Sequence, residues 1–441
     1  MAFVRSIGRL TMTAVVINSL IGSGIFALPG ELNRLLGRAS PFAMVFAAGA
    51  MAVIMACVAE VASQFTEPGG AYLYTRTAFG RFVGIQIAWF FLLAVVGSLA
   101  VAAHVFIDYL TPFLPLTLNS WERSLLMAVL IAIPTAANYR GVRSGANLSN
   151  VMTVAKLAPL VLLIGFGVAR FTHHPQMIHV SEIATPGWSN WARSLALLMG
   201  FAYAGWEESL VPTGEVREPR RTIPFALATG LIAAAGVFTL LQFITVATVG
   251  PNGTEQPLAQ TASVLLRSSG ATVVSIAIML ATYGYMSANL LNDSRLAYSL
   301  ATQGDFPRMF AKIHPRFHTP AVAITSYAFT AWVLAVSGTF QFVLALAAGA
   351  TVIYYAGMCA CLIRLRRLRP TANAFRIPFG PLLSIVAILI SLALMTGLTR
   401  RELLLMCVTA LIASANWLWG WKYHPELQTE PQSVASSLSP Q

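Results

Sequence analysis

A few ionisable residues lie inside long apolar runs of this chain. Lys156 is flanked by "VMTVA" and "LAPLVLLI", and Glu207 and Glu208 follow "FAYAGW". An ionisable side chain in such a setting predicts a functional role, because a charge is costly to bury away from water. The sequence shows no H-E-x-x-H, G-x-S-x-G or P-loop pattern. We therefore expect no enzyme activity, no cofactor, no bound metal and no nucleotide-driven step.

Glycines interrupt two apolar runs where a continuous helix is otherwise expected. "LIGSGIFALPG", residues 20–30, places Gly22, Ser23 and Gly24 together, and "FAYAGWEE", residues 201–208, contains Gly205. Glycine costs about 1 kcal/mol relative to alanine inside a helix. Close packing of helices through small residues is the alternative explanation, but Gly22 and Gly24 are two apart and do not share a helix face. The pattern favours unwound backbone, which a membrane tolerates only where it lines a cavity.

Composition places the elements that carry these residues in lipid. Hydrophobic residues make up 57% of the 441 residues and charged residues only 10%, with a mean hydropathy of +0.70. A soluble domain carries about 25% charged residues. The net charge is +12, but the sequence shows no soluble basic face. We therefore expect no nucleic-acid partner. The cysteines lie in apolar runs and are expected to be reduced: Cys57, Cys359, Cys361 and Cys407.

Run lengths predict an all-α integral membrane protein with twelve spanning helices, since one span needs about 20 apolar residues. The predicted spans are 11–31, 41–64, 82–110, 123–138, 148–170, 191–212, 224–249, 269–300, 321–337, 340–363, 377–397 and 402–421. They form one transmembrane domain, 1–421. Residues 422–441 are polar and predict a disordered cytoplasmic tail.

The distribution of basic residues predicts orientation. With the N-terminus in the cytoplasm, 19 of the 28 Lys and Arg residues lie inside and eight lie outside. Basic residues concentrate in cytoplasmic loops. We therefore expect a multi-pass protein of the cytoplasmic (inner) membrane with both termini inside, and no cleaved signal peptide.

The two interrupted spans are the first and the sixth, which are the first members of two five-helix sets. Transporters built from inverted repeats show interrupted helices at corresponding positions of their two halves. The pattern therefore favours a transporter over a membrane protein that is merely packed through glycines.

Five segments in the correct order resemble the amino acid–polyamine–organocation (APC) transporters, of the sodium-independent amino acid permease type. They are "IGSGIFALPG", "AEVASQFTEPGGAYLYTRTAFG", "VMTVAKLAPLVLLI", "GEVREPRRTIPFAL" and "NDSRLAYSLATQGDFPRMFAKIHPRFHTP". The resemblance implies the leucine-transporter fold: an inverted repeat of five helices, about 10–170 and about 190–363, plus two C-terminal helices within 377–421. It also implies an amino acid as the substrate, bound at mid-membrane.

An amino acid head group explains why the backbone is broken. Exposed N–H groups at the start of a half-helix bind a carboxylate, and carbonyls at the end of a half-helix accept from an ammonium group. Phe201 aligns with an aromatic that closes over the substrate in the family, and Tyr203 and Trp206 are candidates for the side-chain pocket. The predicted substrate-binding residues are Ile17, Asn18, Ile21, Gly22, Ser23, Gly24, Ile25, Phe201, Ala202, Tyr203, Ala204 and Trp206.

Three further residues are predicted to act in coupling or gating. The resemblance places Lys156 where a helix-five lysine replaces a sodium ion in sodium-independent members. Lys156 would either exchange a proton during transport or brace helix one as a fixed charge, with Ser287 as a weak partner. Glu207 matches an acidic family position and is expected to sense protons or to gate.

The predicted function is sodium-independent transport of amino acids by alternating access, as proton symport or as exchange. Span three has no acid before Asp108, which favours neutral substrates. A cationic amino acid or polyamine antiporter remains the alternative, and a non-transporting membrane sensor of amino acids is the alternative of another class. Protons and the lipid bilayer are the expected partners besides the substrate. The sequence does not set an oligomeric state.

Overall fold

The elements of the chain are helical wherever the structure describes them. The computed structural model describes residues 8–22, 24–65, 70–115, 118–141, 145–173, 186–210, 216–249, 256–370 and 374–423, with the backbone alone for 27, 145–156, 268 and 421–423. The first half contains α1 (Arg9–Leu20), α2 (Gly24–Leu36), η1 (Gly37–Ala39), α3 (Ser40–Ala62), α4 (Gly70–Phe79), α5 (Arg81–Leu110), η2 (Thr111–Phe113), α6 (Ser120–Arg140) and α7 (Gly145–His173).

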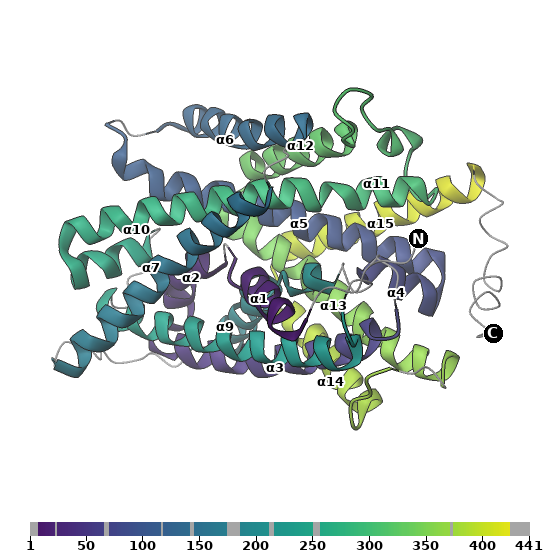
Figure 1. The fold of residues 1–441 in the computed structure, drawn as a ribbon, viewed down its shortest axis with the longest axis horizontal. Helices are drawn as coiled ribbons and strands as arrows, with labels where there is room; N and C mark the ends of the chain where they lie inside the picture. Colours follow the sequence, from purple (N-terminus) through teal and green to yellow (C-terminus); the bar gives the residue numbers. More distant parts are fainter. Residues whose placement is uncertain are drawn as a thin grey trace.

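The second half begins with another interrupted span. Its elements are α8 (Trp188–Leu197), η4 (Leu198–Ala202), η5 (Trp206–Leu210), α9 (Pro219–Val249), α10 (Pro257–Asn292), α11 (Ser294–Thr302), η7 (Arg308–Ala311), α12 (Ala321–Ser337), α13 (Phe340–Leu368), α14 (Gly380–Leu394), η8 (Met395–Gly397) and α15 (Arg400–Tyr423). The long helices run mostly along the longest axis of the molecule (Figure 1).

Local sequence signals set several helix ends. Asn119 caps α6 in a reciprocal capping box with Glu122, with both bonds at 2.9 Å. The Thr339 hydroxyl accepts from the backbone N–H of Phe342 at the start of α13. These side chains satisfy backbone donors that a helix N-terminus leaves unpaired. The caps therefore place the starts of α6 and α13 at defined residues.

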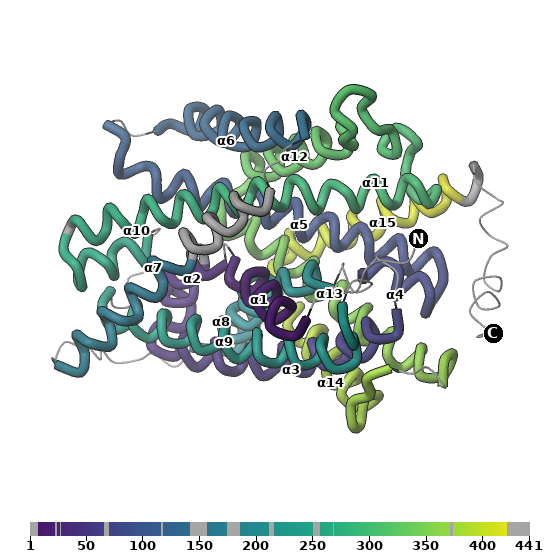
Figure 2. Tube along the Cα trace, in the orientation of Figure 1, coloured from purple at the N-terminus to yellow at the C-terminus, as the bar shows by residue number. Residues whose placement is uncertain are grey.

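Helices α5 and α13 lie at the centre of the bundle and pack extensively on each other. A β-carbon at Gly97 of α5 would lie 2.8 Å from the Ala347 β-carbon of α13. Helix α1 packs on α9 in the same close manner, because a β-carbon at Gly230 would lie 2.5 Å from the Val16 side chain. The trace in Figure 2 shows α1 and α2 as two separate short pieces within this bundle.

Membrane-spanning helices are confirmed, whereas the predicted number of twelve spans stays a prediction. Seven helical segments within the described residues are long and apolar enough to cross a membrane, and two shorter apolar helices cover Leu157–His173 and Ala321–Ser337. Each predicted span does coincide with one to three observed helical elements. The predicted inverted repeat also stays a prediction.

Some predicted boundaries differ from the structure. The span predicted for 269–300 is α10 followed, after a turn at Asp293, by α11, and α10 already begins at Pro257. Arg267 has φ of +65°, so α10 contains a sharp break close to the predicted start. The tail predicted from residue 422 is helical through Tyr423, and 424–441 lie outside the described residues.

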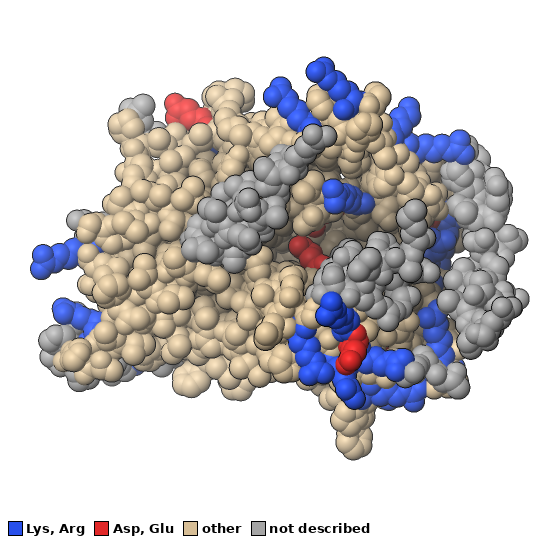
Figure 3. Space-filling model, viewed as in Figure 1, with Lys and Arg blue, Asp and Glu red and all other residues tan. Residues whose placement is uncertain are grey.

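Basic side chains are unevenly distributed over the surface. On the face drawn in Figure 3, Lys and Arg gather mainly toward the end of the molecule at which α4 and the end of α15 lie. Assignment of this end to the cytoplasm follows the sequence-based prediction.

Candidate functional site

The first predicted span is broken at Ile21 and Gly22. The Ile21 N–H still reaches the Ile17 carbonyl at 2.9 Å, but Ile21 has φ −82° and ψ 71°, outside the helical region. The Gly22 N–H turns back to the Leu20 carbonyl at 2.9 Å. Ser23 lies outside the described residues, and α2 begins at Gly24. The glycine cluster therefore marks a real interruption.

The sixth predicted span is broken by a different device. After α8 the backbone widens into one π-helical turn, in which the Tyr203 N–H donates to the Leu198 carbonyl at 2.8 Å. Ala204 and Gly205 follow without helical structure, and Gly205 has φ of +97°, which glycine adopts readily. Helical structure then resumes as a short turn at Trp206.

The two breaks touch each other through backbone. A β-carbon at Gly24 would lie 2.7 Å from the Ala202 Cα and 3.1 Å from the Phe201 carbonyl oxygen. A β-carbon at Gly205 would lie 2.9 Å from the Ser19 carbonyl oxygen. The structure therefore brings the two predicted halves of the substrate site together, and only glycine allows this approach.

The remaining predicted substrate-site residues differ in exposure. Ile21 and Ile25 are buried, whereas Ile17, Asn18 and Gly22 are half-buried beside the break. The nearest neighbour of a β-carbon at Gly22 would be the Tyr285 ring, at 3.6 Å. Tyr285 is an aromatic of α10 that the sequence-based prediction missed.

The predicted aromatics are held mainly by packing. Phe201 is buried, and the fully buried Tyr203 donates its hydroxyl to the Met44 carbonyl at 3.1 Å and packs on Phe238. Trp206 stacks on Tyr355 of α13 with ring centres 5.6 Å apart. These contacts position the second break against α3, α9 and α13.

Glu207 ties the second break to α13. Its carboxylate accepts from the Gly205 N–H at 3.0 Å, from the Tyr355 hydroxyl at 3.1 Å and from the Tyr354 hydroxyl. The two tyrosines were not predicted as site residues. The adjacent "YY" in an apolar run of span ten is the sequence signal that could have identified them.

The predicted coupling residues Lys156 and Ser287 lie on helices that pack together, α7 and α10. The side chain of Lys156 lies outside the described part of the structure. Ser287 is half-buried, and its backbone carbonyl accepts from the Asn138 side chain at 2.9 Å. Contact between Lys156 and Ser287 therefore stays a prediction.

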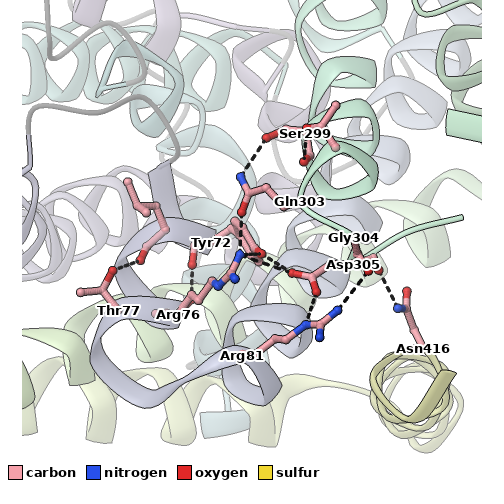
Figure 4. Close-up of polar contacts among 12 residues, drawn as sticks. Tyr72, Arg76, Thr77, Arg81, Ser299, Gln303, Gly304, Asp305 and Asn416 are labelled. Carbon is pink, nitrogen blue, oxygen red and sulfur yellow. Dashed lines mark hydrogen bonds and ion pairs between the residues drawn. The ribbon is translucent and has the colours of Figure 1, made fainter. Parts of the chain in front are cut away.

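A polar cluster joins α4, α5, the end of α11 and α15 (Figure 4). The fully buried Asp305 accepts from the Tyr72 hydroxyl and forms an ion pair with Arg81. Arg76 lies 3.8 Å from Asp305 and donates to the Gln303 side chain at 2.7 Å. Burial, and then the charge of Asp305, raise the pKa of the Tyr72 hydroxyl, which keeps it protonated as a donor.

A second buried ion pair joins the end of α3 to the end of α13. Arg366 donates to both Glu60 oxygens at 2.6 and 2.7 Å, and the Ile377 N–H adds a bond to Glu60 at 2.8 Å. Asp293, by contrast, accepts from the Tyr327 hydroxyl at 3.1 Å. Both acids thus serve contacts between helices.

Comparisons with known proteins agree with the geometry. A model of the family described as "Amino acid permease" matches residues 7–415. The chain is 28% identical to the uncharacterized amino acid permease YecA of Bacillus subtilis, over 76% of this chain and 78% of that one. It is 24% identical to the serine/threonine exchanger SteT of the same organism, over 87% and 89%. It is 29% identical to the human Asc-type amino acid transporter 1, over 73% and 64%.

The family match covers nearly the whole chain, including both of the broken helices described above. The protein therefore belongs to the amino acid permease family of the APC superfamily.

Proposed function

We propose that this permease is a sodium-independent exchanger of neutral amino acids that works by alternating access. The observation that carries the proposal is the contact between two broken helices, in which Gly24 meets the backbone of Phe201 and Ala202. Bare peptide groups from two chain segments converge there. Such groups bind the part that all amino acids share, the carboxylate and the ammonium group.

Each half of the head group has a proposed set of partners. The N-terminal end of α2, with Ser23, Gly24 and Ile25, supplies N–H donors for the carboxylate. Carbonyls of Ile17, Asn18 and Ile21 and of Phe201, Ala202 and Ala204 accept from the ammonium group. Phe201 covers the bound substrate, while Tyr203 and Trp206 hold the break in place.

The contacts of Glu207 favour neutral substrates. A cationic side chain needs an acceptor in the pocket, and Glu207 is the acid next to the second break. Its two oxygens already accept from Gly205, Tyr354 and Tyr355. Glu207 is therefore better suited to link the break to α13 as a gate than to bind a distal charge of the substrate.

Exchange is favoured over proton symport by similarity to a serine/threonine exchanger. In this proposal Lys156 braces the first broken helix as a fixed charge and takes the place of a sodium ion. Proton symport requires that Lys156 or Glu207 release a proton in each cycle, which the experiment below tests.

The test is uptake into proteoliposomes that contain the purified full-length chain. Each of the twenty amino acids is offered in labelled form while the internal amino acid, the pH gradient and sodium are varied separately. We expect uptake of neutral amino acids only with a neutral amino acid inside, and no change when choline replaces sodium.

Other outcomes contradict specific parts of the proposal. Uptake driven by a pH gradient into empty vesicles establishes proton symport in place of exchange. Preferred uptake of arginine or a polyamine establishes the cationic alternative. Binding of amino acids without any uptake identifies a sensor and overturns the proposed function.

A further inference from the structure

The connection between α13 and α14 lies at the edge of the membrane-spanning part of the molecule. It joins two of the segments that are apolar enough to cross a membrane, Phe340–Leu368 and Gly380–Gly397. The 29 residues of α13 are about 43 Å long, whereas the hydrocarbon core of a bilayer is about 30 Å thick. The end of α13 and the connection after it therefore lie at the depth of the lipid headgroups. In Figure 1 this part of the chain projects from the side of the bundle near the α14 label.

A buried ion pair holds the connection in place. Arg366 donates to the carboxylate of Glu60 and, at 2.8 Å, to the Ile377 carbonyl. The Ile377 N–H donates back to Glu60 at 2.8 Å, and the Phe375 N–H donates to the Ser63 hydroxyl at 3.0 Å. The returning chain is thus bound to the ends of both α3 and α13. Side chains on its other side are presented in a fixed arrangement.

Four further arginines surround this anchored connection, and no acid balances them. They are Arg364, Arg367, Arg369 and Arg376. Among the residues that the structure describes, none of the four forms an ion pair with an acid. Arg364 and Arg367 are exposed and three residues apart on α13, so their like charges repel each other. An anion bound between them would remove this repulsion.

An exposed aromatic residue lies beside these charges. Phe379 is 76% exposed and has φ of +53°, in the left-handed region that a bulky residue adopts only at a cost. The next residue, Gly380, packs directly on the Arg366 guanidinium, because a β-carbon there would overlap it. One turn further on, the lipid-exposed stripe of α14 begins; it contains Leu382, Ile385, Leu389 and Leu392. Burial of the Phe379 ring in lipid would offset its unfavourable backbone conformation.

We propose that the α13–α14 connection binds the headgroup of an anionic phospholipid. Arg364 and Arg367 bind its phosphate, since a guanidinium matches a phosphate through two parallel hydrogen bonds. Phe379 enters the hydrocarbon beside the headgroup, as aromatic residues do at membrane interfaces. Basic clusters directly beyond a spanning helix attract anionic lipids. A phosphatidylcholine headgroup carries its own cation and leaves the arginine charges unbalanced. The proposal is independent of the transported substrate.

Basic residues elsewhere on the molecule make a matched comparison possible. Lys and Arg side chains gather on the drawn face above the projecting connection and also at other places on this end of the molecule (Figure 3). Arg308 and Lys312, in and just after η7, are exposed as Arg364 and Arg367 are. Removing either pair changes the net charge equally. Only the pair on α13 should affect a specific lipid site.

The test is native mass spectrometry of the full-length chain in detergent, titrated with phosphatidylglycerol or with phosphatidylcholine. We expect phosphatidylglycerol to bind about tenfold more tightly, and its binding alone to weaken as ionic strength rises. Arg364→Gln combined with Arg367→Gln should lower the affinity for phosphatidylglycerol about fivefold for each arginine removed. Arg308→Gln combined with Lys312→Gln should retain it. Equal binding of the two lipids, or equal losses in the two double variants, overturns the proposed site.

Phe379→Gly separates lipid binding from folding. Glycine adopts the left-handed conformation readily, so the melting temperature should not fall. Loss of the ring should nevertheless weaken binding of phosphatidylglycerol, with the same dependence on ionic strength. Unchanged lipid binding in this variant would exclude insertion of Phe379.

A soluble anion distinguishes a lipid site from a simple phosphate site. Glycerol phosphate, added at the concentration of the lipid, should not displace phosphatidylglycerol, because it lacks the acyl chains that the exposed face of α14 contacts. Displacement at equal concentration would identify a site for soluble anions and overturn the proposal.

Discussion

At the scale of single residues, the proposed substrate site depends on the absence of a side chain at two glycines. Gly24 and Gly205 bring two backbones within contact distance because neither carries a β-carbon. Charged groups near the breaks, such as Glu207, are bound to other protein groups. We therefore expect the smallest substitutions at these glycines to have large effects.

Gly24→Ala tests this expectation. The added β-carbon meets the Ala202 backbone at 2.7 Å, and overpacking of this kind costs about 1–3 kcal/mol. Uptake in proteoliposomes should fall by about ten- to a hundredfold. Gly49→Ala is the control, because a β-carbon there meets nothing within 4 Å. Equal activity of the two variants would remove Gly24 from the site.

Lys156→Ala tests the predicted coupling residue. Loss of the ammonium group removes the charge that replaces sodium in the proposal, so exchange should be abolished or uncoupled while the protein still folds. Purification yield and gel-filtration profile report folding, and labelled uptake reports function. Lys312→Ala, at an exposed position, is the control. Full activity of Lys156→Ala excludes the residue from the mechanism.

At the scale of elements, sequence periodicity and composition located the helices well but not their contacts. The breaks near Gly22 and Gly205 were predictable because glycine clusters are unusual in apolar runs. The polar cluster around Asp305 was not predictable, since it joins residues more than 200 positions apart, such as Tyr72 and Asp305. The predicted spans leave out residues 65–81, where the structure has the ten-residue helix α4, which is too short for a span and packs on α5 and α13.

Asp305→Ala tests how strongly this cluster fixes α4 and α11. Asp305 is fully buried, and its removal leaves Arg81, only 12% exposed, without its carboxylate. Breaking a buried pair costs roughly 3 kcal/mol, so the melting temperature in detergent should drop by several degrees. Glu218→Gln alters an exposed ion pair with 3.9 Å separation and should leave the melting temperature unchanged. Equal melting temperatures would show that the cluster does not contribute.

At the scale of the whole molecule, charge and hydropathy set how the bundle lies in the bilayer. Apolar side chains such as Phe42 and Leu411 are exposed along the helices, as expected for a surface that faces lipid. Basic residues gather at the end with α4 and α15 (Figure 3). The distribution of basic residues among the predicted loops predicts such an asymmetry, because basic residues concentrate in cytoplasmic loops.

Cysteine labelling tests the predicted orientation. A cysteine at Ser189, which is exposed near the start of α8, should react with a membrane-impermeant maleimide added to intact cells. A cysteine at Lys312, exposed beyond α11, should react only after the cells are opened. The parent protein controls for Cys407, the one exposed cysteine in the described residues. The reverse pattern would invert the topology.

The backbone contact between Gly24 and Ala202 also bears on how such a carrier can change over evolutionary time. Peptide groups are the same whatever the side chain, so in the proposed site most substitutions of neighbouring side chains should leave recognition of the shared head group intact. Substitutions around Phe201 are then expected to alter which amino acid is preferred without removing the proposed contacts to the head group. A family of carriers that shares this backbone contact is therefore expected to change its substrate preference without passing through an inactive ancestor.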